Sequence, residues 1–222
     1  MKPNLSLKIG KLKLKNPLMV ASGTFGYAEE FKEFLDLREI GAIVTKTITL
    51  NPRRGNLPPR TCETPSGMLN SIGLENPGLE VFLREKMPLL KKIGTPIIVS
   101  IASEDNPEEF VALAKRLDKI NGVAAIELNI SCPNIKGPST PGPQCPRLIS
   151  QDPKATYAVV KSVRKVTAKT LITKLSPNVT SIVDMALAAK EGGAAAVSLI
   201  NTLVGMAIDV QTWKPGLSNI TG

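Results

Sequence analysis

Short apolar runs recur along the chain after residue 17, and most of them are separated by stretches of helical periodicity. Six of these runs have the length and composition of buried β-strands, and they span residues 18–21, 42–45, 96–101, 124–128, 170–173 and 195–200. Because each run is apolar at consecutive positions, we expect both faces of the strands to be covered, as in a parallel sheet.

Helical patterns occupy three of the gaps between these runs. The first begins at Pro107, the second at Asp152-Pro153 and the third at Thr180, and each starts with residues typical of a helix N-terminus. The residues expected to face inward are Phe110, Leu113, Ala114 and Leu117 in the first helix, Val159, Val160, Val163 and Val166 in the second, and Ile182, Met185, Ala186 and Ala189 in the third. Repeated strand–helix units predict an α/β fold with a parallel sheet.

We predict a (β/α)8 TIM barrel rather than a doubly wound sheet. The total length is near that of one barrel, and no Gly-x-Gly-x-x-Gly follows the first strand. Since only six strands are recognisable, we expect the last two strand–helix units, which usually carry the phosphate site of a barrel, to be missing from a truncated chain. Residues 1–222 are expected to form a single domain, with an alternating hairpin over 4–15 capping one end of the core.

The amino-acid composition excludes several kinds of catalytic and metal site. Histidine is absent, which excludes Ser-His and Cys-His nucleophilic catalysis and the common His-ligated metal sites, and no metal site is expected. Cys62, Cys132 and Cys145 are an odd number at wide spacing, so we expect reduced thiols rather than disulfides or an iron–sulfur cluster within the chain. Any general acid or base must then be Cys, Lys, Tyr or a carboxylate.

Charge and hydropathy limit the kinds of binding partner that we expect. The net charge of +9 comes from scattered Lys and Arg residues with few aromatic residues among them, so nucleic-acid binding is not expected. The chain starts Met1-Lys2-Pro3 without an apolar leader, and no apolar run approaches the length of a membrane span. We therefore expect a soluble, cytoplasmic protein without membrane contact.

The candidate chemistry lies at the ends of the predicted strands. Residues 129–134 follow a buried strand and bring out one thiol, Cys132, between two amides, Asn129 and Asn134. Polar residues also end the other strands: Ser22, Lys46 with Thr47, Ser100, Lys174, and Asn201 with Thr202. A single Lys at a strand end is more often a surface residue, but in a barrel all these positions converge on one site. The loop 70–78 contains a Gly and an Asn suited to a ligand, and the alternative is a plain Gly/Pro connection. Its place after the second strand, beside Lys46, favours a ligand loop.

Together these segments resemble the catalytic subunit of dihydroorotate dehydrogenases, specifically the NAD-linked class 1B. The segments that carry the resemblance are 16–18, 21–26, 46–49, 61–74, 129–134 and 201–203. The resemblance implies an FMN enzyme of pyrimidine biosynthesis that oxidises dihydroorotate to orotate. Cys132 matches the catalytic base that takes the proton from C5 while the C6 hydride passes to the flavin. Electrons would then reach NAD through a partner subunit that carries FAD and a 2Fe-2S cluster, in a heterotetramer.

The same resemblance assigns the binding residues. For FMN it implies Ser22, Lys46, Thr47, Ser100, Asn129, Lys174 and Ile200. For the substrate it implies Lys46, Asn70, Ser71, Ile72, Gly73, Leu74, Asn129, Asn134, Asn201 and Thr202.

Three alternatives remain open from the sequence. The chain could be a fumarate-reducing class 1A dihydroorotate dehydrogenase, an enzyme similar to dihydropyrimidine dehydrogenase, or a degenerate or incomplete barrel that keeps the pocket without binding flavin. The loop 136–147 is proline-rich and longer than the family pattern, and it contains Cys145, whose role the sequence does not define. Its prolines restrict backbone freedom, so we expect a stiffer lid over the site.

Overall fold

A six-stranded parallel sheet is the centre of the structure, a computed structural model that describes residues 3–103, 106–130 and 149–222. In spatial order its strands are β3 (Met19–Val20), β4 (Ala42–Val44), β7 (Ile97–Ile101), β8 (Val123–Asn129), β9 (Thr170–Lys174) and β10 (Ala196–Ser198). Every neighbouring pair is parallel, and the spatial order follows the order along the chain. This is the arrangement of successive strands in a (β/α)8 barrel, so the predicted fold class is confirmed, with six such strands among the described residues.

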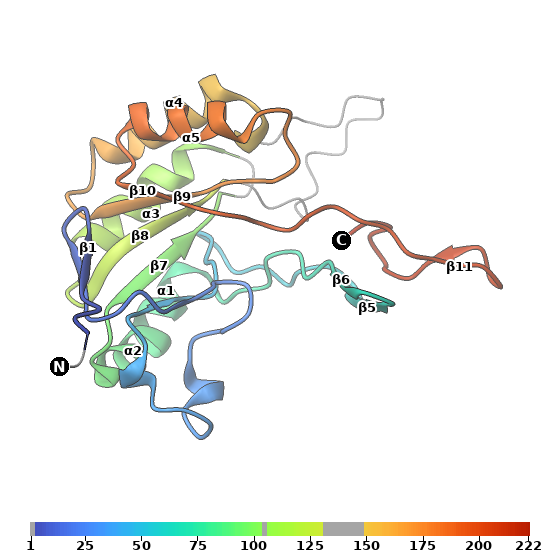
Figure 1. The fold of residues 1–222 in the computed structure, drawn as a ribbon, viewed down its shortest axis with the longest axis horizontal. Coiled ribbons are helices and arrows are strands. Elements are labelled where there is room, and N and C mark those ends of the chain that lie inside the picture. Colours follow the sequence, from blue (N-terminus) through green and yellow to red (C-terminus); the bar gives the residue numbers. More distant parts are fainter. Residues whose placement is uncertain (1–2, 104–105, 131–148) are drawn as a thin grey trace.

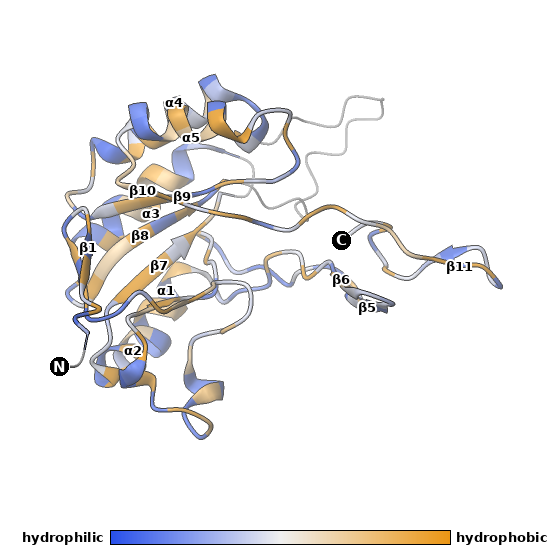
Figure 2. Ribbon diagram, viewed as in Figure 1, coloured by the Kyte–Doolittle hydropathy of each residue, from blue (hydrophilic) through white to orange (hydrophobic). Residues whose placement is uncertain are grey.

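Helices cover one face of the sheet (Figure 1). They are α1 (Gly78–Val81), a π-helical turn (Phe82–Lys86), α2 (Met87–Ile93), α3 (Glu108–Asp118), α4 (Pro153–Arg164) and α5 (Ile182–Gly192). Short 3-10 helices span Glu29–Phe31, Leu37–Glu39 and Ile149–Gln151. The sheet side chains facing these helices, among them Ile43, Val99, Ile126 and Leu171, are buried in the main core. Figure 2 shows the same division, with apolar strands and helices that are apolar on one side and polar on the other.

The three predicted helices are confirmed, and capping side chains fix where they begin. The Asn106 carboxamide accepts from the Glu108 N–H at α3, and Asp152 accepts from the first amides of α4. The third helix begins at Ile182, two residues after the expected start, because the Ser181 hydroxyl caps it by accepting from the Asp184 N–H. The expected inward residues of α3 are all buried, whereas Val166 lies beyond the end of α4 and is half-buried against the core.

The other face of the sheet begins with an apolar layer under the N-terminal hairpin. Strands β1 (Leu7–Ile9) and β2 (Leu12–Leu14) pair antiparallel, and the Lys11 N–H donates to the Thr170 hydroxyl at the amino end of β9. Leu12 and Leu14 are buried against a layer made of Ala42, Val44, Ile98, Ala125 and Ile172. The hairpin therefore closes the amino end of this face, and only the carboxyl end is left for polar residues.

Two further hairpins and one helical segment lie outside the predicted elements. Strand β5 (Thr61–Thr64) pairs with β6 (Gly67–Asn70), and β11 (Ile208–Asp209) pairs with β12 (Lys214–Pro215). The two hairpins extend from the same side of the molecule, and the Ser218 N–H donates to the Pro59 carbonyl between them (Figure 1). Their strands are short and none of their residues is fully buried, so they lack the apolar alternation that marks a buried strand. The helical segment over 78–93 is interrupted by its π turn, which shifts the apolar face and obscures the 3.6-residue period.

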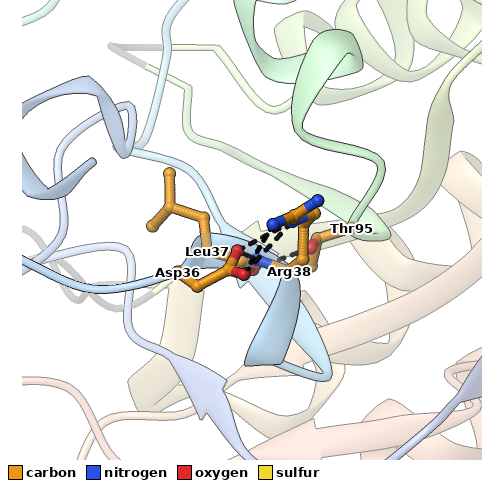
Figure 3. Close-up of polar contacts among 4 residues, drawn as sticks. All are labelled: Asp36, Leu37, Arg38 and Thr95. Atoms are coloured by element: carbon orange, nitrogen blue, oxygen red, sulfur yellow. Dashed lines mark hydrogen bonds and ion pairs between the residues drawn. The ribbon is translucent and has the colours of Figure 1, made fainter. Parts of the chain in front are cut away.

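A separate polar cluster ties the loop after β3 to the amino end of β7 (Figure 3). The Asp36 carboxylate pairs with the Arg38 guanidinium at 2.9 Å, and the Thr95 hydroxyl donates to the Leu37 carbonyl at 2.8 Å. The hydrogen bond from Arg38 lowers the pKa of the Asp36 carboxyl below its usual value. Since Thr95 lies two residues before the start of β7, this cluster fixes the connection at the edge of the sheet opposite the polar strand ends.

Within the described ranges, no helix combines the length and the apolar character that crossing a bilayer requires.

Candidate functional site

The inner face of the sheet changes from apolar to polar toward the carboxyl ends of the strands. On β7 Ile98 is followed two residues later by Ser100, and on β9 Ile172 is followed by Lys174. On β8 the sequence on this face is Ala125, Glu127 and Asn129. Because alternate residues of a strand share a face, these polar side chains all point to the side that the helices do not cover.

Three of these side chains and two from the segments that follow β4 and β10 form one continuous hydrogen-bonded set. We call this set the polar row: Thr47, Ser100, Glu127, Asn129 and Asn201. The Ser100 hydroxyl donates to Glu127 Oε1 at 2.8 Å and lies 3.0 Å from the Thr47 hydroxyl. Asn129 Nδ2 donates to Thr47 Oγ1 at 3.1 Å, and Asn201 Nδ2 donates to Asn129 Oδ1 at 2.9 Å. The row brings together four residues that the sequence places in the site, from the ends of β4, β7, β8 and β10.

Glu127 is the member of the polar row that the sequence-based reasoning missed. It lies within an apolar run, and its side chain is only 4% exposed. The period of two was the available signal, since Glu127 lies two residues before Asn129 and therefore on the same face. Register confirms the placement, because Glu127 is the cross-strand partner of Ser100.

A second pair, Lys174 and Ser22, lies beside the polar row. Lys174 is paired in register with Asn129, and its ammonium group donates to the Ser22 hydroxyl at 3.4 Å. Both side chains are buried. Below them is a cavity of about 290 Å³ whose lining is mostly apolar, with Glu127 and Lys174 as its two charged residues. A larger hollow of about 750 Å³ on the outer surface, between residues 32–38 and 92–93, lies beside the Asp36 cluster and away from these groups.

The loop 70–74 lies at the same edge of the sheet but is held mainly by its neighbours in the preceding loop. Leu74 packs on Ala102, which follows β7. Asn56 donates from Nδ2 to the Ser71 carbonyl and hydroxyl, and the Asn56 N–H donates to the Ile72 carbonyl. Gly73 has φ +75°, and a Cβ there would lie 2.6 Å from the Asn56 nitrogen, so only glycine fits.

Asn76 fixes the end of this loop and is a structural residue that the sequence-based reasoning did not single out. Its Oδ1 accepts from the Thr49 and Gly78 N–H groups, and its Nδ2 donates to the Leu74 carbonyl. The side chain is buried, and these bonds join the end of the loop to the segment that follows β4.

The remaining expected site residues lie around the polar row. Lys46 directly precedes Thr47 and is half-buried, and its N–H donates to the Gly26 carbonyl. Thr202 donates its N–H to Asn201 Oδ1 and accepts at its carbonyl from Asn178 Nδ2. Ile200 is 43% exposed in the segment that follows β10.

Cys132, Asn134, Cys145 and the loop 136–147 lie outside the described residues. The described chain continues past β8 to Ile130, and Cys132 stands two positions further along the sequence. Among the residues that the structure does describe, no cluster of three or more His, Cys, Asp and Glu side chains is arranged to hold a metal ion.

The donor set suits a planar, uncharged heterocycle better than a metal or a polyanion. Hydroxyls and carboxamides supply both donors and acceptors, which match a ring with alternating carbonyl and N–H groups. One buried ammonium group, on Lys174, can support negative charge that develops on such a ring. The residues present therefore fit the pyrimidine edge of a flavin and a pyrimidine ligand beside it.

Comparison with known proteins identifies the family. The family profile described as dihydroorotate dehydrogenase matches residues 4–222. The chain is 52% identical over 221 residues to the "Dihydroorotate dehydrogenase B (NAD(+)), catalytic subunit" of Geotalea uraniireducens, and 52% identical over 222 residues to the protein of that name from Trichlorobacter lovleyi. The protein of the same name from Geobacter sulfurreducens is also 52% identical. Each alignment covers 100% of this chain and 70% of the relative. The chain therefore belongs to the dihydroorotate dehydrogenase family of enzymes.

Proposed function

We propose that this chain is the catalytic subunit of an NAD-linked dihydroorotate dehydrogenase, which oxidises dihydroorotate to orotate in pyrimidine biosynthesis. The observation that carries the proposal is the polar row, since it gathers Thr47, Asn129 and Asn201 from separate strands at one sheet edge. Its support comes from relatives of that name with 52% identity over the whole chain.

The proposal includes FMN as the cofactor. FMN, when bound, would supply the acceptor for the hydride that leaves C6 of the substrate. Lys174 and Ser22, held together at 3.4 Å, would meet its pyrimidine edge, where the ammonium group favours negative charge. The other residues proposed to contact it are Lys46, Thr47, Ser100, Asn129 and Ile200.

The substrate is proposed to bind above the polar row. Each carboxamide offers an N–H and a carbonyl side by side, which is complementary to the C=O and N–H pairs of a dihydropyrimidine ring. Asn129, Asn201 and Thr202 would orient the ring, and the Lys46 ammonium would pair with the substrate carboxylate. Asn70, Asn134 and the backbone of residues 71–74 complete the proposed substrate contacts.

Cys132 is proposed as the base that removes the proton from C5. Only the thiolate can accept this proton. A free thiol has a pKa of about 8.5, so a cation nearby favours the reactive form. Lys46 is the residue that we propose for this task. With no histidine in the chain, a cysteine base is consistent with the composition.

Electrons are proposed to leave through a partner subunit that carries FAD and a 2Fe-2S cluster, in a heterotetramer, and to reach NAD there. The phrase "catalytic subunit" in the names of the relatives supports a second subunit. Copurification with such a partner, followed by NAD reduction with dihydroorotate, tests this part separately from the chemistry at Cys132.

The central experiment follows flavin absorbance after anaerobic mixing of the FMN-loaded protein with dihydroorotate. We expect rapid bleaching in the unmodified protein and a loss of at least about a hundredfold in rate with Cys132→Ala, because general-base catalysis contributes on this scale. Cys62→Ala is the matched control, since Cys62 lies in the β5–β6 hairpin. Undiminished bleaching with Cys132→Ala, or a protein that binds FMN and is not bleached by dihydroorotate, would contradict the proposal.

A further inference from the structure

Glu127 is a buried carboxylate to which the proposed reaction assigns no task. It lies in the middle of β8 with its side chain in the mostly apolar cavity, and it accepts a hydrogen bond from the Ser100 hydroxyl at 2.8 Å. Burial of a charged group among apolar side chains costs free energy. Packing alone therefore does not explain why a glutamate occupies this position.

The carboxylate sets the direction of the hydrogen bonds in the polar row from Ser100 through Thr47 to Asn129. A carboxylate oxygen can only accept, so the single hydroxyl hydrogen of Ser100 is committed to Glu127. In the 3.0 Å contact between Ser100 and Thr47, the Thr47 hydroxyl must then be the donor. With its hydrogen committed in turn, Thr47 can only accept from the next residue, which is Asn129.

This direction fixes the orientation of the Asn129 carboxamide. Its Nδ2 must face Thr47 and its Oδ1 must face Asn201, and these are the atoms that make the contacts of 3.1 Å and 2.9 Å. A carboxamide flipped by 180° would place two acceptors or two donors against each other at both contacts. Among the described residues Asn129 makes these two side-chain bonds, which leaves one N–H and one lone pair in defined positions for a ligand.

We propose that Glu127 is a positioning residue, whose carboxylate orients the Asn129 carboxamide through Ser100 and Thr47 so that it matches the donor and acceptor pattern of the pyrimidine substrate. The inference rests on the proposed function for the identity of the ligand. The direction of the hydrogen bonds does not depend on the ligand and can be tested without it.

Lys174 offers a competing role for Glu127, and the test must separate the two. Lys174 is the register partner of Asn129, two residues further along than the partner of Glu127, so both charges lie on the same face of neighbouring strands and line one cavity. A Glu127 that served only to balance the charge of Lys174 would act without Ser100. A Glu127 that orients the Asn129 carboxamide must act through the Ser100 hydroxyl.

The experiment is a double-mutant cycle on orotate affinity in the FMN-loaded protein. Glu127→Met keeps the volume, removes the acceptor and suits the apolar cavity. We expect it to lower the affinity about tenfold, the effect of one hydrogen bond of typical strength. Ser100→Ala is expected to have a similar effect. Adding Glu127→Met to the Ser100→Ala variant should lower the affinity no further. Glu127→Gln retains an acceptor oxygen and should recover most of the affinity, while Glu191→Met at the exposed end of α5 is the control.

A second readout is independent of the ligand. In protein labelled with ¹⁵N-asparagine, the side-chain amide signals of Asn129 should shift with Glu127→Met and with Ser100→Ala, and change little with Glu191→Met. If Glu127→Met does not fold, Thr47→Val breaks the same row at another link and must shift these signals and lower orotate affinity.

Two results would overturn the inference: an equal loss of affinity with Glu127→Met in the presence and absence of the Ser100 hydroxyl, or unchanged Asn129 signals in Ser100→Ala. Shifted amide signals in a protein that does not bind orotate would instead contradict the proposed function and leave the orienting role of Glu127 supported.

Discussion

The carboxamide of Asn201 donates to the carboxamide oxygen of Asn129 at 2.9 Å, although β9 lies between β8, which carries Asn129, and β10, which Asn201 follows. The chain after β10 makes this possible, because the Asn201 N–H bonds to the Leu175 carbonyl just beyond β9. Three strand ends must therefore be in register before the two carboxamides meet. The hydrogen bond between Asn201 and Asn129 therefore forms only when the site is assembled.

Removal of either carboxamide should weaken orotate binding. We expect Asn129→Ala and Asn201→Ala each to lower the affinity of the FMN-loaded protein about tenfold, and the double variant to lose less than the product, because each amide supports the other. Asn129→Asp should be worse than Asn129→Ala, since it places a carboxylate oxygen against the Thr47 oxygen. Asn121→Ala, before the amino end of β8, is the control for titration calorimetry. Independent, fully multiplicative effects would show that the two amides do not act together.

Loss of the Lys174 charge should make the bound flavin harder to reduce. The buried ammonium group stabilises negative charge on the reduced ring, so Lys174→Met is expected to lower the two-electron potential by on the order of 30 mV, which corresponds to a tenfold preference. Ser22→Ala removes only the hydroxyl at 3.4 Å and should shift the potential less. Spectroelectrochemical titration measures both, and an unchanged potential in Lys174→Met would remove Lys174 from the flavin site.

Gly73 should not tolerate a side chain. At φ +75° an alanine is strained, and its Cβ would lie 2.6 Å from the Asn56 nitrogen, so we expect Gly73→Ala to lower the free energy of unfolding by about 2 kcal/mol. Orotate affinity should fall as well, because the loop 70–74 would move. Gly67→Ala is a matched control in the nearby hairpin, where the nearest atom to a new Cβ is 4.0 Å away. Chemical denaturation of both variants checks this, and equal stabilities would show that the loop adapts.

Asp118 should make stability depend on pH. Its Oδ1 accepts from the Thr167 hydroxyl and the Ala168 N–H, and these hydrogen bonds lower the pKa of its carboxyl. Because the folded pKa is depressed, the stabilisation is complete above the unfolded value of about 3.9 and is lost as the pH falls through the folded pKa.

The comparison is between the unmodified protein and Asp118→Ala, which we expect to be about 1 kcal/mol less stable at pH 7 because this partly exposed carboxylate loses two hydrogen bonds. The difference should shrink below pH 4. Asp118→Asn keeps Oδ1 and removes only the charge, so it should lie between the two. A difference between the unmodified protein and Asp118→Ala that stays constant down to pH 2 would contradict the assignment.

The sequence by itself determined the six strands of the parallel sheet and the three long helices. Strands such as β7 and β8 are apolar at most positions, and helices α3 and α4 carry both a capping residue and a 3.6-residue apolar stripe. These signals are local, so they can be read before the chain is folded. The same holds for the strand-end residues Ser100, Asn129 and Lys174, which interrupt apolar runs.

Only the tertiary structure decided which polar groups meet. Glu127 is hidden in an apolar run and becomes part of the site because parallel pairing places it beside Ser100, 27 positions earlier. The β5–β6 and β11–β12 hairpins likewise show no apolar pattern of their own, and only in space does the Ser218 N–H after β12 meet the Pro59 carbonyl before β5. Hydrogen-bond direction depends on the whole set of partners in space, and a linear pattern of residues does not specify that set.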